Sequence, residues 1–87
     1  MSDVTGYLHS GDSIYWTDPS DYSRHGPDVI TGFWEIGIDA NGNPGAGVNI
    51  AAVVRNSYIT QIPVLLIVQR TSAFDGSVMH FRNGVPV

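Results

Sequence analysis

Residues 29–38 read Val-Ile-Thr-Gly-Phe-Trp-Glu-Ile-Gly-Ile, and this stretch decides the class of fold. Large apolar residues recur at every second position, which is the period of a β-strand with one buried face. The parity that we place inward contains Ile30, Trp34, Ile36 and Ile38. Gly32 interrupts that parity and permits a bend in a long strand. Residues 39–45 follow with an Asn-Gly pair, which predicts a hairpin turn.

Shorter β-rich runs lie on both sides of this stretch, and turn residues separate them. Before it, residues 12–17 place Ile14 and Trp16 on one face, and a polar loop spans 18–28. After it, we expect strands at 48–55, 58–62, 64–68 and 77–82. The predicted turns lie at 55–57 and 83–84, and a 3₁₀ turn after Pro63 leads into the 64–68 run. The pattern predicts a small all-β domain.

The length of 87 residues is that of one domain. We therefore interpret residues 1–87 as a single unit, with a barrel core at about 10–69 and a C-terminal extension at 70–87. A core fits into a chain of this size, but a core with a deep substrate cleft does not.

Charge and composition exclude several classes of function. The net charge is −4, with no lysine and four scattered arginines, so a cationic surface for nucleic acid is not expected. The chain has no cysteine, which excludes disulfides and thiolate chemistry. The longest apolar run, 64–68, is too short to span a membrane, and the first residues do not resemble a signal peptide. We expect a cytoplasmic protein without membrane contact.

No motif predicts catalysis, a cofactor or a metal. The histidines His9, His25 and His80 lack the spacing of a metal site. Asp39-x-Asn41-x-Asn43 opens like a calcium loop, but Pro44 and Ile50 occupy positions that need Gly and Glu. The sequence also lacks a Gly-x-Ser-x-Gly elbow and a phosphate-binding Gly-rich loop. We expect a protein that is not an enzyme.

Aromatic residues divide between the core and a candidate partner surface. Trp16 and Trp34 are predicted to be core residues. Residues of the opposite parity and of the polar loop form the candidate surface, which is edged by acidic groups including Asp28 and would suit a basic or proline-containing peptide. The residues predicted to bind a partner are Tyr15, Asp18, Asp21, Tyr22 and Phe33.

The C-terminal extension carries a second apolar group, Phe74, Met79 and Phe81. Two alternatives are open for it. These side chains either cap the open end of the barrel or make a homodimer contact, because an extra strand is readily donated to a neighbouring copy.

Three short motifs resemble a known family. They are Gly11-Asp12-x-Ile14-Tyr15-Trp16-x-Asp18-Pro19, then Gly32-x-Trp34-x-Ile36, then Ile62-Pro63-x-x-Leu66. The pattern is similar to small bacterial and phage proteins with an SH3-like barrel. That resemblance implies a five-stranded, strongly bent barrel with a 3₁₀ turn before the last strand, and it implies no activity. The acidic segment of eukaryotic peptide-binding SH3 domains is missing, so their proline-rich specificity is not carried over.

These observations favour a non-enzymatic protein-interaction module that binds a protein or peptide and self-associates, as an accessory protein of a bacterium or phage. Two alternatives stay open. One is a phage-type inhibitor that binds a host protein through its acidic face. The other is a small-molecule binder or enzyme whose site forms at an oligomer interface.

Overall fold

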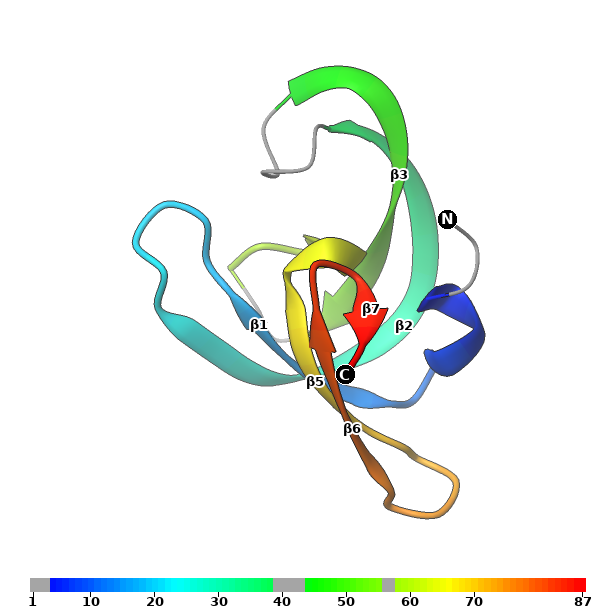
Figure 1. Cartoon of the computed structure of the whole chain (residues 1–87). Coiled ribbons are helices and arrows are strands. Elements are labelled where there is room, and N and C mark those ends of the chain that lie inside the picture. The colour runs from blue at the N-terminus through cyan, green and yellow to red at the C-terminus, as the bar shows by residue number, and fades with distance from the viewer. Residues whose placement is uncertain (1–3, 39–43, 56–57) are drawn as a thin grey trace.

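The computed structural model describes residues 4–38, 44–55 and 58–87. Strands make up almost all of its regular structure, as Figure 1 shows, together with two short 3₁₀ turns that we call η1 and η2. In chain order the elements are η1 (Val4–Tyr7), β1 (Ser13–Thr17), β2 (Arg24–Ile38), β3 (Pro44–Arg55), β4 (Gln61–Pro63), η2 (Val64–Leu66), β5 (Ile67–Thr71), β6 (Val78–Arg82) and β7 (Val85–Pro86). Over these ranges no helix is long and apolar enough to cross a membrane. The turns predicted at 39–45 and 55–57 lie largely outside the described residues.

The strands form one antiparallel sheet in the order β4-β3-β2-β1-β5-β6-β7. The predicted all-β class is therefore confirmed. The sheet has seven strands and is open, whereas a closed five-stranded barrel was expected. The two additional strands come from the C-terminal extension, which continues the sheet beyond β5.

A β-bulge early in β2 reverses the predicted parity of that strand. Ile30 pairs with Val54 but Gly32 pairs with Val53, so two residues of β2 oppose one of β3. The Thr31 hydroxyl donates a hydrogen bond to the Val53 carbonyl, 3.1 Å away, and so satisfies an acceptor at the irregularity.

The prediction of an inward Trp34 is wrong for this reason. Before the bulge, Ile30 is buried; after it, Phe33 packs against the core and Trp34 is 60% exposed. A one-residue slip moves every later side chain to the other face of the sheet. The side chains of Ile36 and Ile38, which were also placed inward, lie outside the described part of the chain.

Trp16 of β1 is buried in the hydrophobic core, as predicted. Burial of a large apolar side chain contributes roughly 1.5–3 kcal/mol, so a few such residues account for much of the folding energy. The largest buried apolar side chains are Leu8, Ile14, Trp16, Ile30, Ile62, Ile67 and Phe81.

Two buried charged residues tie η1 to the turn between β5 and β6. The Asp12 carboxylate accepts hydrogen bonds from the backbone N–H groups of His9 and Ala73, each at 2.9 Å. The Arg70 guanidinium donates to the Tyr7 carbonyl at 2.7 Å and to the Ser77 hydroxyl at 3.2 Å. These hydrogen bonds offset the cost of burying the two charged groups, although the Arg70 Nε has no hydrogen-bond partner among the described residues.

The C-terminal extension is an integral part of the sheet. Asn83 and Gly84 both have positive φ, at 51° and 79°, which is the conformation of a two-residue hairpin turn between β6 and β7. Phe81 lies in the core and Met79 packs against it, while Phe74 is 98% exposed. The homodimer alternative for these residues stays a prediction.

Candidate functional site

The turn between β1 and β2 is built from two successive Asp-x-Ser units. Asp18 Oδ1 accepts hydrogen bonds from the Ser20 backbone N–H at 2.8 Å and from the Ser20 hydroxyl at 2.7 Å. Asp21 Oδ1 accepts from the Ser23 N–H at 3.0 Å and from the Ser23 hydroxyl at 2.6 Å. An aspartate that bonds to the backbone two residues ahead imitates one side of a β-turn. The side chains thereby hold the turn closed.

The hydrogen bonds from Ser23 also affect the ionisation of the exposed Asp21 carboxylate. The hydroxyl and then the backbone N–H of Ser23 stabilise the ionised form of Asp21, and nearby His25 adds to this, so the pKa of Asp21 is lowered from its ordinary value. Asp21 is therefore a fixed negative charge at neutral pH.

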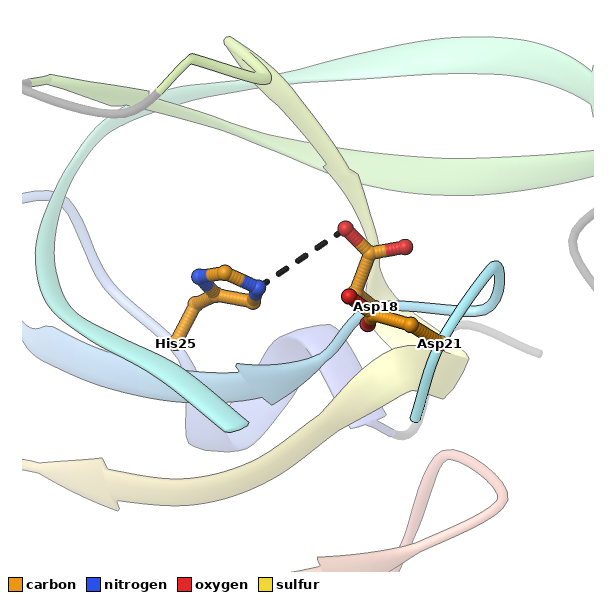
Figure 2. A group of neighbouring side chains, drawn as sticks. All are labelled: Asp18, Asp21 and His25. Carbon is orange, nitrogen blue, oxygen red and sulfur yellow. Dashed lines mark ion pairs between the residues drawn. The ribbon is translucent and has the colours of Figure 1, made fainter. Parts of the chain in front are cut away.

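The second oxygen of Asp18 contacts the side chains of Tyr58 and His25. The Tyr58 hydroxyl donates to Asp18 Oδ2, and His25 Nε2 lies 3.7 Å from the same oxygen, as the dashed line in Figure 2 shows. The His25 ring stacks on Trp16 with centroids 4.8 Å apart, and Tyr58 meets it edge-on at 5.4 Å. This cluster joins the turn to β1, to the start of β2 and to the segment before β4.

The direction of the hydrogen bond between Ser23 and His25 determines whether the imidazole can accept the hydroxyl proton of Ser23. The single hydroxyl hydrogen of Ser23 is donated to Asp21. His25 Nε2, which is 2.7 Å from Ser23 Oγ, must therefore carry a hydrogen and donate it. A serine nucleophile needs the reverse polarity, in which the imidazole accepts the hydroxyl proton. In this arrangement His25 does not activate Ser23.

Asp18, Asp21 and His25 are also the residues that could hold a metal ion. One ligand atom from each lies within 4.8 Å of the others (Figure 2), and carboxylates with imidazole suit zinc and related ions. Hydrogen bonds already engage both oxygens of Asp18, one oxygen of Asp21 and Nε2 of His25. The network accounts for the grouping of these side chains without an ion.

The turn displays Tyr22 to solvent. Tyr22 has φ of 59°, a left-handed conformation that is costly for a side chain with Cβ, and it is 83% exposed. Its N–H donates to the Asp18 carbonyl at 2.8 Å, and the Asp18 N–H donates to the Ser23 carbonyl at 2.9 Å. These hydrogen bonds thus hold Tyr22 in its strained backbone conformation, with the side chain exposed to solvent.

A groove of about 740 Å³ runs past Tyr22. One wall is the β1–β2 turn, the floor belongs to η2 and β5, and the other wall is the β6–β7 hairpin. The side of Gly84 in that hairpin lies against Leu65, which brings the two elements together. The residues that characterise the groove are Pro19, Tyr22, Leu65, Leu66, Arg82 and Asn83.

The structure brings together part of the set predicted to bind a partner. Asp18, Asp21 and Tyr22 lie in the turn, but Asp18 is only 4% exposed and its oxygens are engaged internally. Tyr15 is half-buried beneath the Arg24 guanidinium, 4.6 Å from its ring centre, and Phe33 packs against the core. Neither is among the described residues that line the groove.

Asp28, named as an edge of the acidic surface, is buried as well. It accepts the indole N–H of Trp16 at 2.7 Å. Of the three loop carboxylates, Asp21 alone is exposed, so the acidic surface is smaller than the sequence implied.

Sequence reasoning missed the far side of the groove and the interior cluster. Leu65, Leu66 and Arg82 come from elements distant in sequence from the turn, and no local pattern predicts that they meet. The Asp-x-Ser repeat was a usable signal, because it occurs at 18–20, 21–23 and 75–77 and makes the same backbone bond each time.

Comparison with known proteins finds no match. No family model matches the sequence, no curated protein is similar to it, and no solved structure is similar to the fold.

Proposed function

We propose that the protein is a non-enzymatic interaction module that binds a short peptide segment of a partner protein in the groove beside Tyr22. The observation that carries this proposal is the strained, exposed Tyr22 at the rim of a groove that is lined by apolar and polar groups in equal measure. Aromatic side chains with few rotatable bonds make effective binding anchors, and backbone strain is retained where the surrounding structure enforces it.

The strand order supports an SH3-like arrangement with two added strands. Within the sheet, β4-β3-β2-β1-β5 is a meander whose last strand returns to the first, and η2 stands between β4 and β5. A 3₁₀ turn before β5 is what the family resemblance implies, although the sheet is open and not closed into a barrel. The groove lies between the β1–β2 turn and η2, where loops of different strands converge.

The Tyr22 side of the groove favours a segment with an apolar residue beside a basic one, whereas the cationic Arg82 on the opposite wall disfavours a basic residue there. Leu65, Leu66 and Tyr22 offer apolar contact area, and the ionised Asp21 adjoins the Tyr22 rim. The net charge of −4 also attracts a cationic segment over a longer range. On the opposite wall, Arg82 offers hydrogen-bond donors to peptide carbonyl groups.

Burial of the acidic loop residues weakens the alternative of an inhibitor with an acidic face. Asp18 and Asp28 are held by Tyr58 and Trp16 inside the fold, so they do not present charge to a partner. A contact through the groove uses the apolar surface that the structure does expose.

Selection from a random peptide display library tests the proposal. The full chain is expected to enrich segments with an apolar residue next to Lys or Arg, and Tyr22→Ala is expected to lose them. Phe74→Ala is the matched control, since Phe74 is also an exposed aromatic but does not line the groove. Equal enrichment by the full chain and by Tyr22→Ala would contradict the proposal.

A further inference from the structure

The sheet has a side that faces away from the core, which we call the outer face. Along β1 every second residue is buried, as Ile14 and Trp16 show, so the residues between them point to the outer face. Residues that are paired across two antiparallel strands point to the same side of the sheet. Arg24 of β2 is paired with Thr17 of β1 and therefore belongs to the outer face, where it is exposed.

The other two exposed arginines lie on the same face. Arg55 of β3 is paired with Val29, which is paired with Ser13 of β1, so these three residues point outward together. The exposed residues of β6, which include His80 and Arg82, continue this face beyond β5. The three arginines are far apart in the sequence, and the pairing of the strands brings them to one side of the sheet.

The carboxylates lie elsewhere in the described part of the chain. Three are buried, and the two that are exposed, Asp21 and Asp75, lie in the turns that follow β1 and β5. Because β1 and β5 are antiparallel, these two turns stand at opposite ends of the sheet. Both ion pairs between described residues involve histidine, and neither involves an arginine. The outer face is therefore cationic, although the chain has a net charge of −4.

Arg24 is positioned with N–H donors that an anion can use. Its guanidinium lies over the Tyr15 ring, 4.6 Å from the ring centre, and donates to the Gln69 side-chain oxygen at 2.7 Å. Both partners are neutral, so they hold the guanidinium in place without neutralising its charge. A guanidinium has five N–H donors, and a carboxylate accepts two parallel hydrogen bonds from it. The contact with Gln69 leaves enough donors for such a pair.

We infer that the outer face binds an acidic segment of a partner protein, with one of its carboxylates on Arg24. Val78 and Val85, which are 53% and 59% exposed, offer apolar contact on the same face, since Val85 is paired with Arg82. The inference does not rest on the proposed groove, because neither Arg24 nor Arg55 is among the described residues that line it.

A nucleic acid matches this face less well than an acidic peptide does. Its backbone carries a phosphate at every nucleotide, and its affinity comes from many cations that contact successive phosphates. Here neutral side chains separate the three arginines, as Val29 and Ser13 do between Arg55 and the β1 strand. The net charge of −4 also repels a polyanion more strongly than a segment with a few carboxylates.

Titration of the full chain with a probe peptide, followed by heteronuclear NMR, tests the inference. The probe is an alternating Glu-Val peptide, and its Gln-Val counterpart is the uncharged control. The Glu-Val peptide is expected to shift the Arg24 side-chain N–H signal and the amide signals of β1, β5 and β6 until saturation, and the Gln-Val peptide is expected to shift none of them. Equal shifts with both peptides, no shift with either, or tighter binding of a single-stranded oligothymidine overturns the inference.

Three variants then locate the contact. Arg24→Gln is expected to weaken binding of the Glu-Val peptide about tenfold, because charge-assisted hydrogen bonds are lost. Phe74→Asp changes the net charge by the same amount at an exposed site in the β5–β6 turn, and its affinity is expected to stay within about twofold because solvent and salt screen a distant charge. Tyr22→Ala removes the anchor of the groove and is expected to bind the Glu-Val peptide like the unaltered chain. Equal weakening in Arg24→Gln and Phe74→Asp, or loss of binding in Tyr22→Ala, overturns the inference.

Discussion

The β1–β2 turn and the outer parts of β2 and β3 are stabilised in different ways. In the turn, side chains complete the hydrogen bonding: Asp18 and Asp21 each hold the serine two residues ahead, and Tyr58 reaches across from another segment. Along the outer parts of β2 and β3, pairing between the two strands is the bonding that the structure describes, and its register shifts between Ile36 and Ile38. A turn closed by side chains can hold one residue in a fixed position for binding, whereas strand pairing alone fixes only the backbone.

The largest expected effect is on the core that both regions share. Trp16→Ala should destabilise the fold by about 3–5 kcal/mol, because it leaves a cavity and removes the partner of Asp28 and the stacking surface of His25. Domains are typically stable by about 5–15 kcal/mol, so this variant is expected to be partly or fully unfolded. Urea unfolding followed by circular dichroism measures the change. Trp34→Ala is the control, and a loss as large as that of Trp16→Ala would mean that β2 is placed incorrectly.

A methyl group at Gly26 should disturb the start of β2 beside the turn. Gly26 has φ of 132°, and a Cβ there would lie 2.6 Å from the Ile14 carbonyl oxygen. The clash and the backbone conformation together predict a loss of about 2–4 kcal/mol for Gly26→Ala. Gly76→Ala separates the two causes, since Gly76 also has positive φ but an added Cβ would meet nothing within 4 Å. Its expected loss is about 1 kcal/mol, and equal losses would show that the clash is absent.

Asp18→Asn weakens the turn more selectively. The asparagine NH₂ takes the place of one of the two acceptor oxygens and cannot accept the hydrogen bond of the Tyr58 hydroxyl. We therefore expect the free energy of unfolding to fall by about 1–2 kcal/mol and peptide binding to weaken. Asp75→Asn is the matched control, because Asp75 makes the same Asp-x-Ser bond at an exposed site. Surface changes of that kind are usually within about 0.5 kcal/mol. Similar losses of stability in both variants would show that the contact of Asp18 with Tyr58 does not stabilise the fold.

The smallest expected effect is the acid titration of the turn. The pKa of Asp21 is lowered by its bonds to Ser23, so its contribution to stability is present above the unfolded-state pKa and is lost as the pH falls through the lower folded value. NMR titration should place the Asp21 midpoint below that of an unperturbed aspartate. Ser23→Ala should move it upward, and an unchanged midpoint would show that the hydroxyl bond is not formed in solution.

Local pattern predicted several elements well. The period of two in residues 12–17 identified β1 and its buried face, and Asn-Gly at 83–84 identified the β6–β7 hairpin turn. The exposed pair Asp21 and Tyr22 was chosen correctly as surface residues, whereas Asp18 and Phe33 were not, because their environments depend on Tyr58 and on the β2 bulge. The groove could not be predicted at all, since its walls come from segments more than forty residues apart.

The sequence by itself determined the all-β class, the acidic net charge and the absence of thiols, because these follow from composition and from the spacing of apolar residues. Tertiary structure alone decided which face of β2 is buried, because Thr31 is accommodated as a bulge only where Val53 and Val54 lie opposite. It also decided that Asp18 closes a turn and that Phe81 completes the core. Burial depends on what lies across the sheet, and no local pattern contains that information.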